Sequence, residues 1–487
     1  MKTKIFKLTI LIIFFIISFP GHSKGQELKG QELKVYGNEI GLISKMMDQY
    51  ENKDLFSGTI LLAKNNKIVF NKAYGYADKE NTIRISLNSQ FRLASVSKLF
   101  TIVAICKLYD EGKLDFNDKI GKYLDGFSKD ISEKVTIAHL IKMKSGFGDY
   151  LRDDEFRKNR SAFKTVDELL RIIKKEELAF EPGSDIMYSN SGFVVLGGII
   201  EKISGKDYFE YIKNNILIPA GMEHTYFPDS PENKNEVVRY NRNILGGYKK
   251  LLTTYPATPA GNACSSQEDL LKFIYIVCNS NNIISEKAKE MCFFDVNLNY
   301  INENGNKVTL SSGPKKVFAW TGGLPGVSTI LVHVIKDDLT LIVLSNYSDI
   351  STEVAENIVS IMISGKHNDV LIPARETVYK AYTENGIDFV KENFTELTKN
   401  YKNISQASDI LNEIGYEFVK TKNIQDAINI LKLNTELFPD DANTWDSLGE
   451  VYMLAENKEL AIENYEKSLK LNPGNLNAAE KLKVLKE

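Results

Sequence analysis

The chain is poor in cysteine and histidine, the residues that build disulfide frameworks and most zinc sites. Its 487 residues include four cysteines and five histidines, and no Cys-x-x-Cys or His-x-His pair brings two metal ligands together. The sequence therefore gives little support to a zinc hydrolase, and we expect no metal and no other cofactor. Cys278 and Cys292 could pair outside the cytosol, but buried free thiols are the simpler interpretation.

A strong excess of charge is also absent. The 61 lysines and arginines nearly balance 64 aspartates and glutamates, which gives a formal net charge of -3. No block of basic residues offers a surface suited to a phosphate backbone. We therefore expect no nucleic-acid partner.

The sequence has no long apolar run except one near the amino terminus. Three lysines precede an uncharged, mostly apolar run over residues 8–19, and the small residues Gly21 and Ser23 follow it. A membrane-spanning helix needs about 20 apolar residues, so this run is too short for one. The pattern instead predicts a cleaved signal peptide over residues 1–23. We therefore expect export to the periplasm or the cell exterior, with no stable membrane span after cleavage.

Behind a linker at residues 24–34, strand patterns lie at both ends of a long helical region. Lys64-Asn65-Asn66 separates two alternating runs and is typical of a β-hairpin turn. Strands at both ends with helices between them predict an α+β domain, whose antiparallel sheet combines N- and C-terminal segments. The predicted elements are a helix at 40–50, strands at 57–63 and 67–73, helices between 95 and 205, strands at 328–335 and 339–344, and a helix at 352–364.

The C-terminal tail carries an internal repeat of 34 residues. Trp445-x-x-Leu448-Gly449-x-x-Tyr452 resembles the tetratricopeptide pattern, a helix–turn–helix unit. We place these repeats at 411–487, after a helical connector at 367–410. Such a tail is either a structural extension or a groove for a protein partner. Residues that recur after 34 positions are Gly415 and Gly449, Ala427 and Ala461, and Pro439 and Pro473.

The segment Ser95-Val96-Ser97-Lys98 carries the strongest chemical signal. A helix predicted from residue 95 to about residue 108 places Ser95 and Lys98 one turn apart on the same face. A serine in the first turn of a helix also sits where backbone N–H groups favour negative charge. This arrangement suits covalent catalysis by an activated serine. The spacing alone decides little, because Ser161-x-x-Lys164 and Ser312-x-x-Lys315 share it.

Further segments follow in a fixed order, and with them residues 50–366 resemble the serine β-lactamase and penicillin-binding family, in its class C and esterase-like branch. We expect the hydrolase domain itself to span residues 35–366. The resemblance implies a β-lactamase/transpeptidase-like antiparallel sheet flanked by a helical subdomain, before the all-α tail. The segments are Phe91-Arg92-Leu93-Ala94 before the nucleophile, Val135-Thr136-Ile137-Ala138-His139-Leu140-Ile141, Phe180-Glu181-Pro182-Gly183, Tyr188-Ser189-Asn190, Leu217-x-Pro219-x-Gly221-Met222, Ala260-Gly261 and Trp320-Thr321-Gly322-Gly323.

The resemblance also implies roles for individual residues. Ser95 would attack a carbonyl, while neutral Lys98 or a tyrosinate at Tyr188 would accept its proton. Asn190 would hold Lys98 and a substrate amide, and the backbone N–H groups of Ser95 and Gly323 would form the oxyanion hole. His139 and His224 fall outside the catalytic set, so we expect them to be structural.

The third segment departs from the family pattern. Its first position usually carries Lys or His, but here it is Trp320, followed by Thr321, Gly322 and Gly323 as further substrate-binding candidates. An indole offers one N–H donor and an apolar face without charge, so we expect weaker recognition of anionic substrates. An ester, amide or peptide substrate then fits better than efficient hydrolysis of penicillins.

Three interpretations remain open at this point. The first is an exported serine hydrolase that acts through an acyl-enzyme on an ester, amide, peptide or β-lactam bond. The second keeps the fold but makes the protein a sensor that is acylated slowly and signals through its tail. The third is a tetratricopeptide interaction protein in which the hydrolase domain is a scaffold.

Overall fold

The computed structural model describes most of the chain as two compact units. One unit is Met1–Asn241 with Lys250–Asn368, and the other is Arg242–Lys249 with Asp369–Glu487. The predicted signal peptide and linker lie outside the described residues. Those residues are 37–228, 235–252, 255–294, 298–301, 307–310, 317–400 and 407–486.

The larger unit is built on a five-stranded antiparallel sheet in the order β11-β12-β13-β1-β2. β1 pairs with β13 from Gly58↔Ser345 to Lys64↔Leu339, so the two ends of the domain meet in the centre of the sheet. The predicted antiparallel sheet of N- and C-terminal strands is therefore confirmed. The strands are β1 (Gly58–Lys64), β2 (Lys67–Tyr74), β11 (Val317–Leu324), β12 (Val327–Val334) and β13 (Leu339–Ser345).

The β1–β2 hairpin shows how the sequence directs this local structure. Asn65 and Asn66 join the strands with φ angles of 50° and 56°. A tight hairpin turn of this kind needs positive φ at both central residues, and asparagine tolerates it better than most side chains. The predicted hairpin therefore lies where its sequence placed it.

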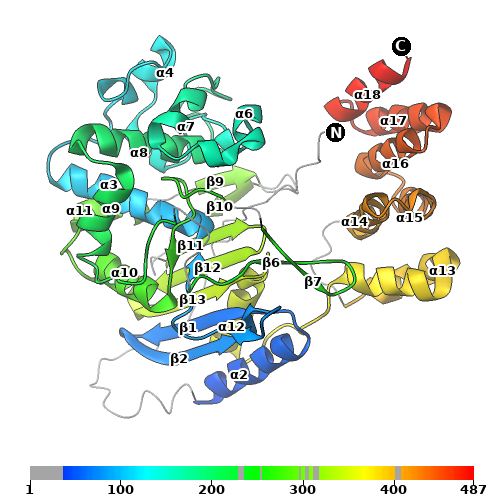
Figure 1. Ribbon diagram of the computed structural model, residues 1–487, viewed down its shortest axis with the longest axis horizontal. Coiled ribbons are helices and arrows are strands. Elements are labelled where there is room, and N and C mark those ends of the chain that lie inside the picture. The colour runs from blue at the N-terminus through cyan, green and yellow to red at the C-terminus, as the bar shows by residue number, and fades with distance from the viewer. Residues whose placement is uncertain are drawn as a thin grey trace. The chain divides into compact units, whose positions relative to one another are not determined.

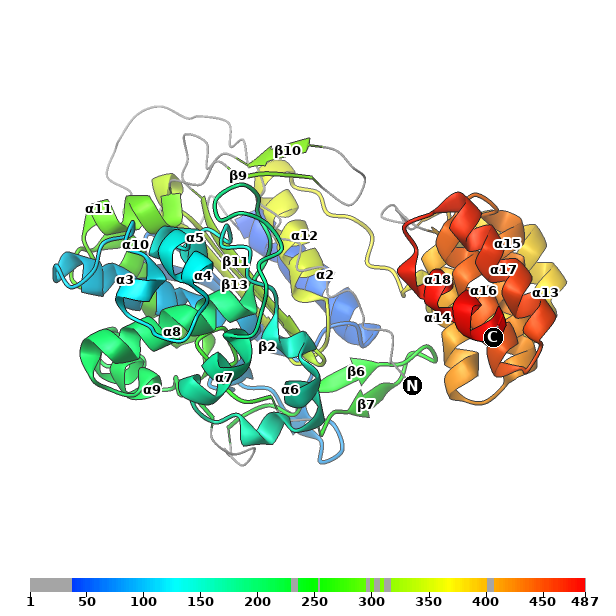
Figure 2. The ribbon, with the colours of Figure 1, turned by 90° about the horizontal axis from the view of Figure 1, so that it is seen from above.

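Helices cover both faces of the sheet (Figure 2). α2 (Gly37–Asn52) and α12 (Ser351–Ser364) pack together on one face, and α10 (Gln267–Asn279) packs on the other. Because both faces are covered, β1 is buried along nearly its whole length rather than on alternate residues. The helices predicted at 40–50 and 352–364 correspond to α2 and α12.

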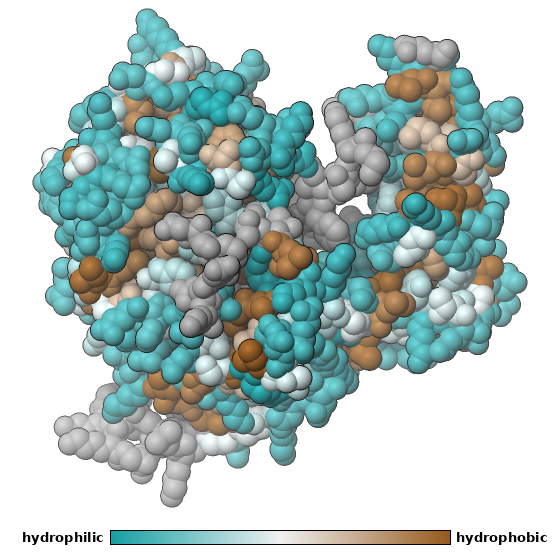
Figure 3. Space-filling model, viewed as in Figure 1, coloured by the Kyte–Doolittle hydropathy of each residue, from teal (hydrophilic) through white to brown (hydrophobic). Residues whose placement is uncertain are grey.

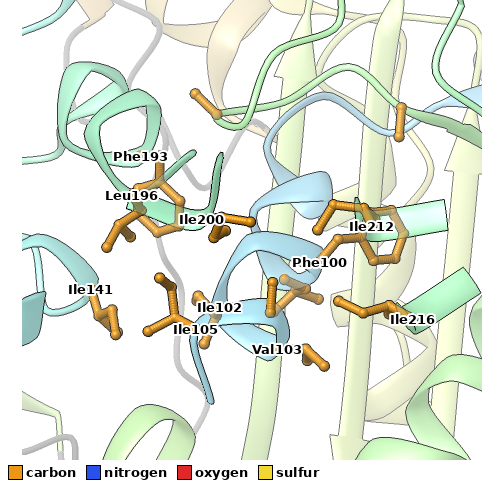
Figure 4. Packing of buried hydrophobic residues seen from close by; sticks show 14 of the residues in the cluster. Phe100, Ile102, Val103, Ile105, Ile141, Phe193, Leu196, Ile200, Ile212 and Ile216 are labelled. Atoms are coloured by element: carbon orange, nitrogen blue, oxygen red, sulfur yellow. The ribbon is translucent and has the colours of Figure 1, made fainter. Parts of the chain in front are cut away.

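A helical subdomain surrounds α3 (Lys98–Asp110). Figure 4 shows Phe100, Ile102 and Ile105 of α3 among Phe193 and other apolar side chains of α8 and of the segment after α9. Burial on nearly every side explains why α3 carries more apolar residues than the single stripe of a surface helix. The remaining helices of this unit include α4 (Lys129–Lys134), α5 (Ile137–Ile141), α6 (Asp154–Lys158), α7 (Val166–Ile173), α8 (Asn190–Ser204), α9 (Tyr208–Ile212) and α11 (Glu286–Lys289).

The α-helix predicted from Ser95 actually begins three residues later. Ser95 lies in a short 3-10 turn, η1 (Ala94–Ser97), and α3 starts at Lys98. Ala94, the first residue of η1, has a φ of 44°, outside the range of a right-handed α-helix, so the chain turns sharply before α3 begins. Short strands accompany the main sheet: β3 (Tyr76–Asp78), β4 (Ile83–Arg84), β5 (Phe91–Arg92), β8 (Cys264–Ser265), β9 (Leu298–Ile301) and β10 (Lys307–Leu310).

The smaller unit is a stack of antiparallel helices (Figure 1). The hairpin of β6 (Tyr240–Arg242) and β7 (Tyr248–Lys250) contributes its tip to this unit, where Arg242 forms a bidentate ion pair with Glu376. The helices are α13 (Ala374–Thr398), which is kinked at Gly386, α14 (Ala407–Lys420), α15 (Ile424–Leu437), α16 (Ala442–Leu454), α17 (Lys458–Leu471) and α18 (Leu476–Lys486).

Contacts in this stack repeat with the 34-residue period of the sequence. The Asn434 side chain donates to the Ser408 carbonyl at 2.9 Å, and the Ser468 hydroxyl, 34 residues later, donates to the Ala442 carbonyl at 2.8 Å. A Cβ on Gly415 would lie 2.6 Å from the Leu431 side chain, so glycine allows the two helices to approach closely. The repeat seen in the sequence is therefore a repeat of packing and hydrogen bonding.

The described helices include none that is both long and apolar enough to cross a bilayer. Hydrophilic side chains cover most of the face shown in Figure 3, with apolar residues scattered between them.

Candidate active site

The turn that carries Ser95 is held by the segment that ends at β8. Leu93 donates its backbone N–H to the Ala263 carbonyl at 2.8 Å, and Asn262 donates its N–H to the Ala94 carbonyl at 3.0 Å. These bonds lie on either side of Ala94, just before Ser95, and hold Ala94 in its unusual conformation. Backbone strain of this kind persists only where the surroundings enforce it, as is common at functional sites.

Ser95 lies within hydrogen-bonding distance of two groups that could accept its proton. Its Oγ is 2.5 Å from the Tyr188 hydroxyl and 3.3 Å from Lys98 Nζ. Lys98 Nζ also donates to Asn190 Oδ1 at 2.7 Å and to the Ala260 carbonyl at 2.5 Å. The structure thus brings together the serine, lysine, tyrosine and asparagine that the sequence singled out.

Burial changes the protonation of Lys98. The side chain is fully buried, and the loss of solvation lowers the pKa of Lys98 from 10.5 to about 7, partly offset by the negative charge of Asp149. A neutral amine has two N–H groups and one lone pair. Asn190 Oδ1 and the Ala260 carbonyl can only accept hydrogen bonds, so they engage both N–H groups. The lone pair is then left for the hydroxyl of Ser95.

Tyr188 is shifted in the opposite direction. Burial raises the pKa of the Tyr188 phenol, and the hydrogen bond with Ser95 only partly offsets this. The resting side chain therefore carries a neutral hydroxyl that can donate to Ser95 Oγ. Tyr188 lies just before α8, whose first turn is capped by the Ser189 side chain accepting from the Gly192 N–H.

Asp149 is a site residue that the sequence analysis missed. Its Oδ2 accepts a hydrogen bond from Asn190 Nδ2 at 3.0 Å, while its Oδ1 accepts from the Leu151 N–H at 3.1 Å. Asp149 thereby fixes the orientation of the Asn190 amide, so that Asn190 Oδ1 faces Lys98. The residue precedes the short helix at Tyr150–Arg152 and belongs to none of the motifs, so its sequence gave no signal for this position.

The third segment lies on β11, the edge strand nearest to η1. The Trp320 indole N–H donates to the Ser95 carbonyl at 2.8 Å. Any side chain at Gly322 would collide with this turn, because a Cβ would lie 2.2 Å from the Leu93 carbonyl oxygen. Thr321 is half-buried. The indole N–H of Trp320, which was expected to be available to a substrate, is thus hydrogen-bonded to the turn that carries Ser95.

A pocket opens beside Ser95. Aromatic side chains from three segments form much of its wall, and none of the described residues that line it carries a charge at neutral pH. Such a pocket suits an apolar or neutral acyl group. The lining residues are Ala94, Ser95, Tyr150, Leu151, Phe156, Asn190, Tyr255, Pro256, Thr258, Ala260, Gly261, Asn262, Gly323 and Leu324.

Other candidates from the sequence lie apart from this pocket. Ser161 is exposed and donates its hydroxyl to Asn159 Oδ1, while Ser312 lies outside the described residues. His139 completes a capping box with Thr136 at the start of α5, which is a structural role. Across the described ranges, no group of three or more His, Cys, Asp or Glu side chains could hold a metal ion.

Comparison with known proteins agrees with this geometry. The beta-lactamase family pattern matches residues 42–362, about two thirds of the chain. The chain belongs to the beta-lactamase family. A tetratricopeptide repeat pattern also matches residues 442–475, within the helical unit. The resemblance and the fold class predicted from the sequence are therefore confirmed.

Three members or structural relatives illustrate the breadth of the similarity. Penicillin-binding protein 4* of Bacillus subtilis (strain 168) is 31% identical over 344 residues, which cover 62% of this chain and 71% of that protein. Protein flp of Staphylococcus aureus (strain N315) is 30% identical over 49% of this chain and only 48% of its own length. The structure of EstCE1, "a hydrolase with promiscuous acyltransferase activity", superposes with a TM-score of 0.58 at 18% identity, over 68% of this chain and 100% of that structure.

Proposed function

We propose that this protein is an exported serine hydrolase that acts through an acyl-enzyme on an ester, amide or peptide bond. One observation carries the proposal: Ser95 Oγ lies 2.5 Å from the Tyr188 hydroxyl and 3.3 Å from a buried lysine, at the edge of a pocket. A hydroxyl placed against a lowered-pKa amine is an activated nucleophile.

Acylation begins with transfer of the Ser95 proton to Lys98. Because the pKa of Lys98 is about 7, a large fraction of the amine is neutral at neutral pH and can accept that proton. Ser95 Oγ then attacks the carbonyl carbon, and negative charge develops on the carbonyl oxygen. We assign the backbone N–H groups of Ser95 and Gly323 to this oxygen, since both residues line the pocket.

Collapse of the tetrahedral intermediate needs a proton for the leaving group. The neutral Tyr188 hydroxyl, 2.5 Å from Ser95 Oγ, is placed to supply it. The resulting phenolate is stabilised by the new ammonium on Lys98, whose Nζ lies 4.9 Å from the centre of the Tyr188 ring. Tyr188 can then take a proton from water and so act as the base in deacylation.

The pocket favours substrates without a negative charge near the scissile bond. Its described lining residues are neutral, and the sequence resemblance implies a Lys or His at the position that Trp320 occupies. We therefore expect hydrolysis of neutral short-chain esters or of amides and peptides to exceed hydrolysis of penicillins. The acyl group of a small substrate would fit against Tyr150, Phe156 and Tyr255.

A fluorophosphonate probe and a panel of substrates test this proposal. We expect the probe to label wild-type protein and to fail with Ser95→Ala, while short-chain p-nitrophenyl esters turn over and nitrocefin is a poor substrate. Ser161→Ala is the matched control, because it alters the exposed serine of a second Ser-x-x-Lys segment. Labelling without turnover would instead indicate a sensor, and absence of labelling would overturn the serine mechanism.

The tail supports a second role beside hydrolysis. A tetratricopeptide match over residues 442–475 favours a protein partner for the helical unit. We propose that this partner is bound without participation of Ser95. A pull-down in which Ser95→Ala retains the partner, and deletion of the tail loses it, would support binding by the tail that is independent of hydrolysis at Ser95.

A further inference from the structure

Outside the proposed catalytic pocket, two cysteine side chains face one another in the core of the larger unit. The Sγ atoms of Cys106 and Cys292 lie 2.8 Å apart, although 186 positions separate the residues in the sequence. Cys106 is fully buried and Cys292 is 7% exposed. The separation is too short for two unbonded sulfur atoms at rest, and it is less than an ångström longer than a disulfide bond of about 2.04 Å.

We propose that Cys106 and Cys292 form a disulfide in the mature protein. The cross-link would join α3 to the π-helical turn η6 (Glu290–Phe294). The sequence suggested Cys278 as a partner for Cys292, whereas the geometry points to Cys106. The inference does not depend on which bond the enzyme hydrolyses.

Neighbouring contacts show that this pair lies in an ordered interface rather than at a chance approach. Cys106 and Asp110 are four residues apart and therefore share one face of α3. The Asp110 carboxylate accepts hydrogen bonds from the Ser285 backbone N–H at 2.6 Å and from the Ser285 hydroxyl at 2.5 Å. Lys287 lies 5.3 Å from the centre of the Tyr109 ring. These contacts hold the segment that begins at Ser285 against α3 and bring Cys292 to Cys106.

The cross-link would also connect two walls of the catalytic site. α3 begins at Lys98, the proposed base. On the other side, Phe293 of η6 packs against Phe318 of β11 with ring centres 5.1 Å apart. β11 continues to Gly323 beside the pocket. A bond between Cys106 and Cys292 would therefore limit the separation of the nucleophile helix from the strand that faces it.

The chemistry of formation follows from the burial of both thiols. Burial raises the pKa of the Cys106 thiol, so the folded protein contains little Cys106 thiolate to attack a disulfide. We therefore expect the bond to form while the chain folds, by exchange with a small-molecule disulfide such as oxidised glutathione. One thiolate attacks the oxidant and releases one reduced thiol, and the second thiolate then releases another. The two cysteines lose two protons and two electrons, and the oxidant is reduced to two thiols.

Mass spectrometry of the full-length protein tests the proposal directly. The protein is refolded in a buffer of reduced and oxidised glutathione, quenched in acid, unfolded and treated with N-ethylmaleimide. We expect adducts on Cys264 and Cys278 only, together with a proteolytic peptide that links Cys106 to Cys292. Four adducts, or a peptide that links Cys278 to Cys292, would overturn the proposal.

Thermal unfolding supplies a second measurement, which begins with the wild-type protein. A cross-link over so long a loop should raise the melting temperature, so reduction of wild-type protein should lower it by roughly 5 °C or more. Cys292→Ala should abolish this sensitivity to reductant, whereas the matched variant Cys278→Ala should keep it. A wild-type protein whose melting temperature is the same with and without reductant would count against the bond.

Discussion

Trp320 donates its indole N–H to the backbone carbonyl of Ser95, 2.8 Å away. The bond joins β11 to the turn that holds the proposed nucleophile, so we expect Trp320, at the position where the sequence resemblance implies Lys or His, to have a positioning role. A charged side chain at this position would interact with an anionic substrate, whereas Trp320 braces the turn instead.

Replacement of this tryptophan should therefore impair catalysis through geometry. Trp320→Phe keeps the aromatic bulk but leaves the Ser95 carbonyl without its donor, which typically costs about 1–3 kcal/mol. We expect kcat for a short-chain ester to fall roughly tenfold with little change in KM. Trp445→Phe is the matched control, because its indole N–H bonds to the Pro439 carbonyl in the helical unit. Equal activity of the two variants would contradict the positioning role.

The pH dependence of hydrolysis should report the protonation of Lys98. The pKa of Lys98 is lowered to about 7, so the base is neutral above pH 7 and protonated below it. Activity should rise with pH and approach a plateau above about pH 8, with kcat/KM falling about tenfold per unit well below pH 7. Rates measured from pH 5 to 9 check this. A profile that stays flat down to pH 5 would exclude Lys98 as the base.

Asp149 should tune that profile, because its negative charge raises the pKa of Lys98. Asp149→Asn removes the charge, so the acidic limb should move to lower pH. Loss of the fixed Asn190 orientation should also reduce plateau activity by roughly tenfold. Asp153→Asn is a suitable control, because Asp153 caps α6 by accepting from the Glu155 and Phe156 N–H groups. If Asp149 had only a structural role, Asp149→Asn would lower the plateau activity without changing the pH at which activity falls.

His333 should make the protein sensitive to acid. Its ring is buried on β12, Nδ1 lies 2.9 Å from the Thr340 hydroxyl, and burial lowers the pKa of His333 to about 4. Between about pH 6.5 and 4 the unfolded chain binds a proton that the folded protein excludes, so stability falls as the pH drops through this window. The loss amounts to about 3 kcal/mol when complete.

Urea unfolding at pH 7 and pH 4.5 measures this effect. His333→Asn should show a smaller difference between the two midpoints than the wild type, even if it is less stable at both. The control His224→Asn alters an exposed histidine and should keep the wild-type difference. An unchanged difference in His333→Asn would assign the acid sensitivity to other groups.

Elements with strong local patterns could be predicted from the sequence, but contacts between loops could not. The Asn65-Asn66 turn and the 34-residue repeat each reflect a local rule, and both appear in the structure. The ordered motifs likewise predicted Ser95 and Tyr188 as site residues, and their side chains lie within hydrogen-bonding distance of each other. The helix predicted from about Ser95 is present, but its first turn is 3-10 rather than α, and the bonds from residues 262 and 263 that hold this turn could not be seen in the local sequence.

The Ala260 carbonyl as a partner of Lys98, and Asp149 as a partner of Asn190, could not be predicted for a similar reason. The Ala260 acceptor is a backbone carbonyl, a group that every residue possesses. Asp149 acts through a loop whose position depends on the helices around it, and a single carboxylate outside any motif resembles many surface residues. Only the folded chain shows which carbonyl and which carboxylate reach the site.

The pairing of β1 with β13 has a consequence for the timing of activity during synthesis. β1 pairs early with β2 in the hairpin, but its second partner, β13, exists only when residues 339–345 have been made, nearly 300 positions after the hairpin begins. The Leu93 carbonyl beside the nucleophile likewise waits for the Thr329 hydroxyl on β12. A nascent chain therefore cannot assemble the proposed catalytic site until almost the entire domain has been synthesised, so we expect no activity from a partly made chain.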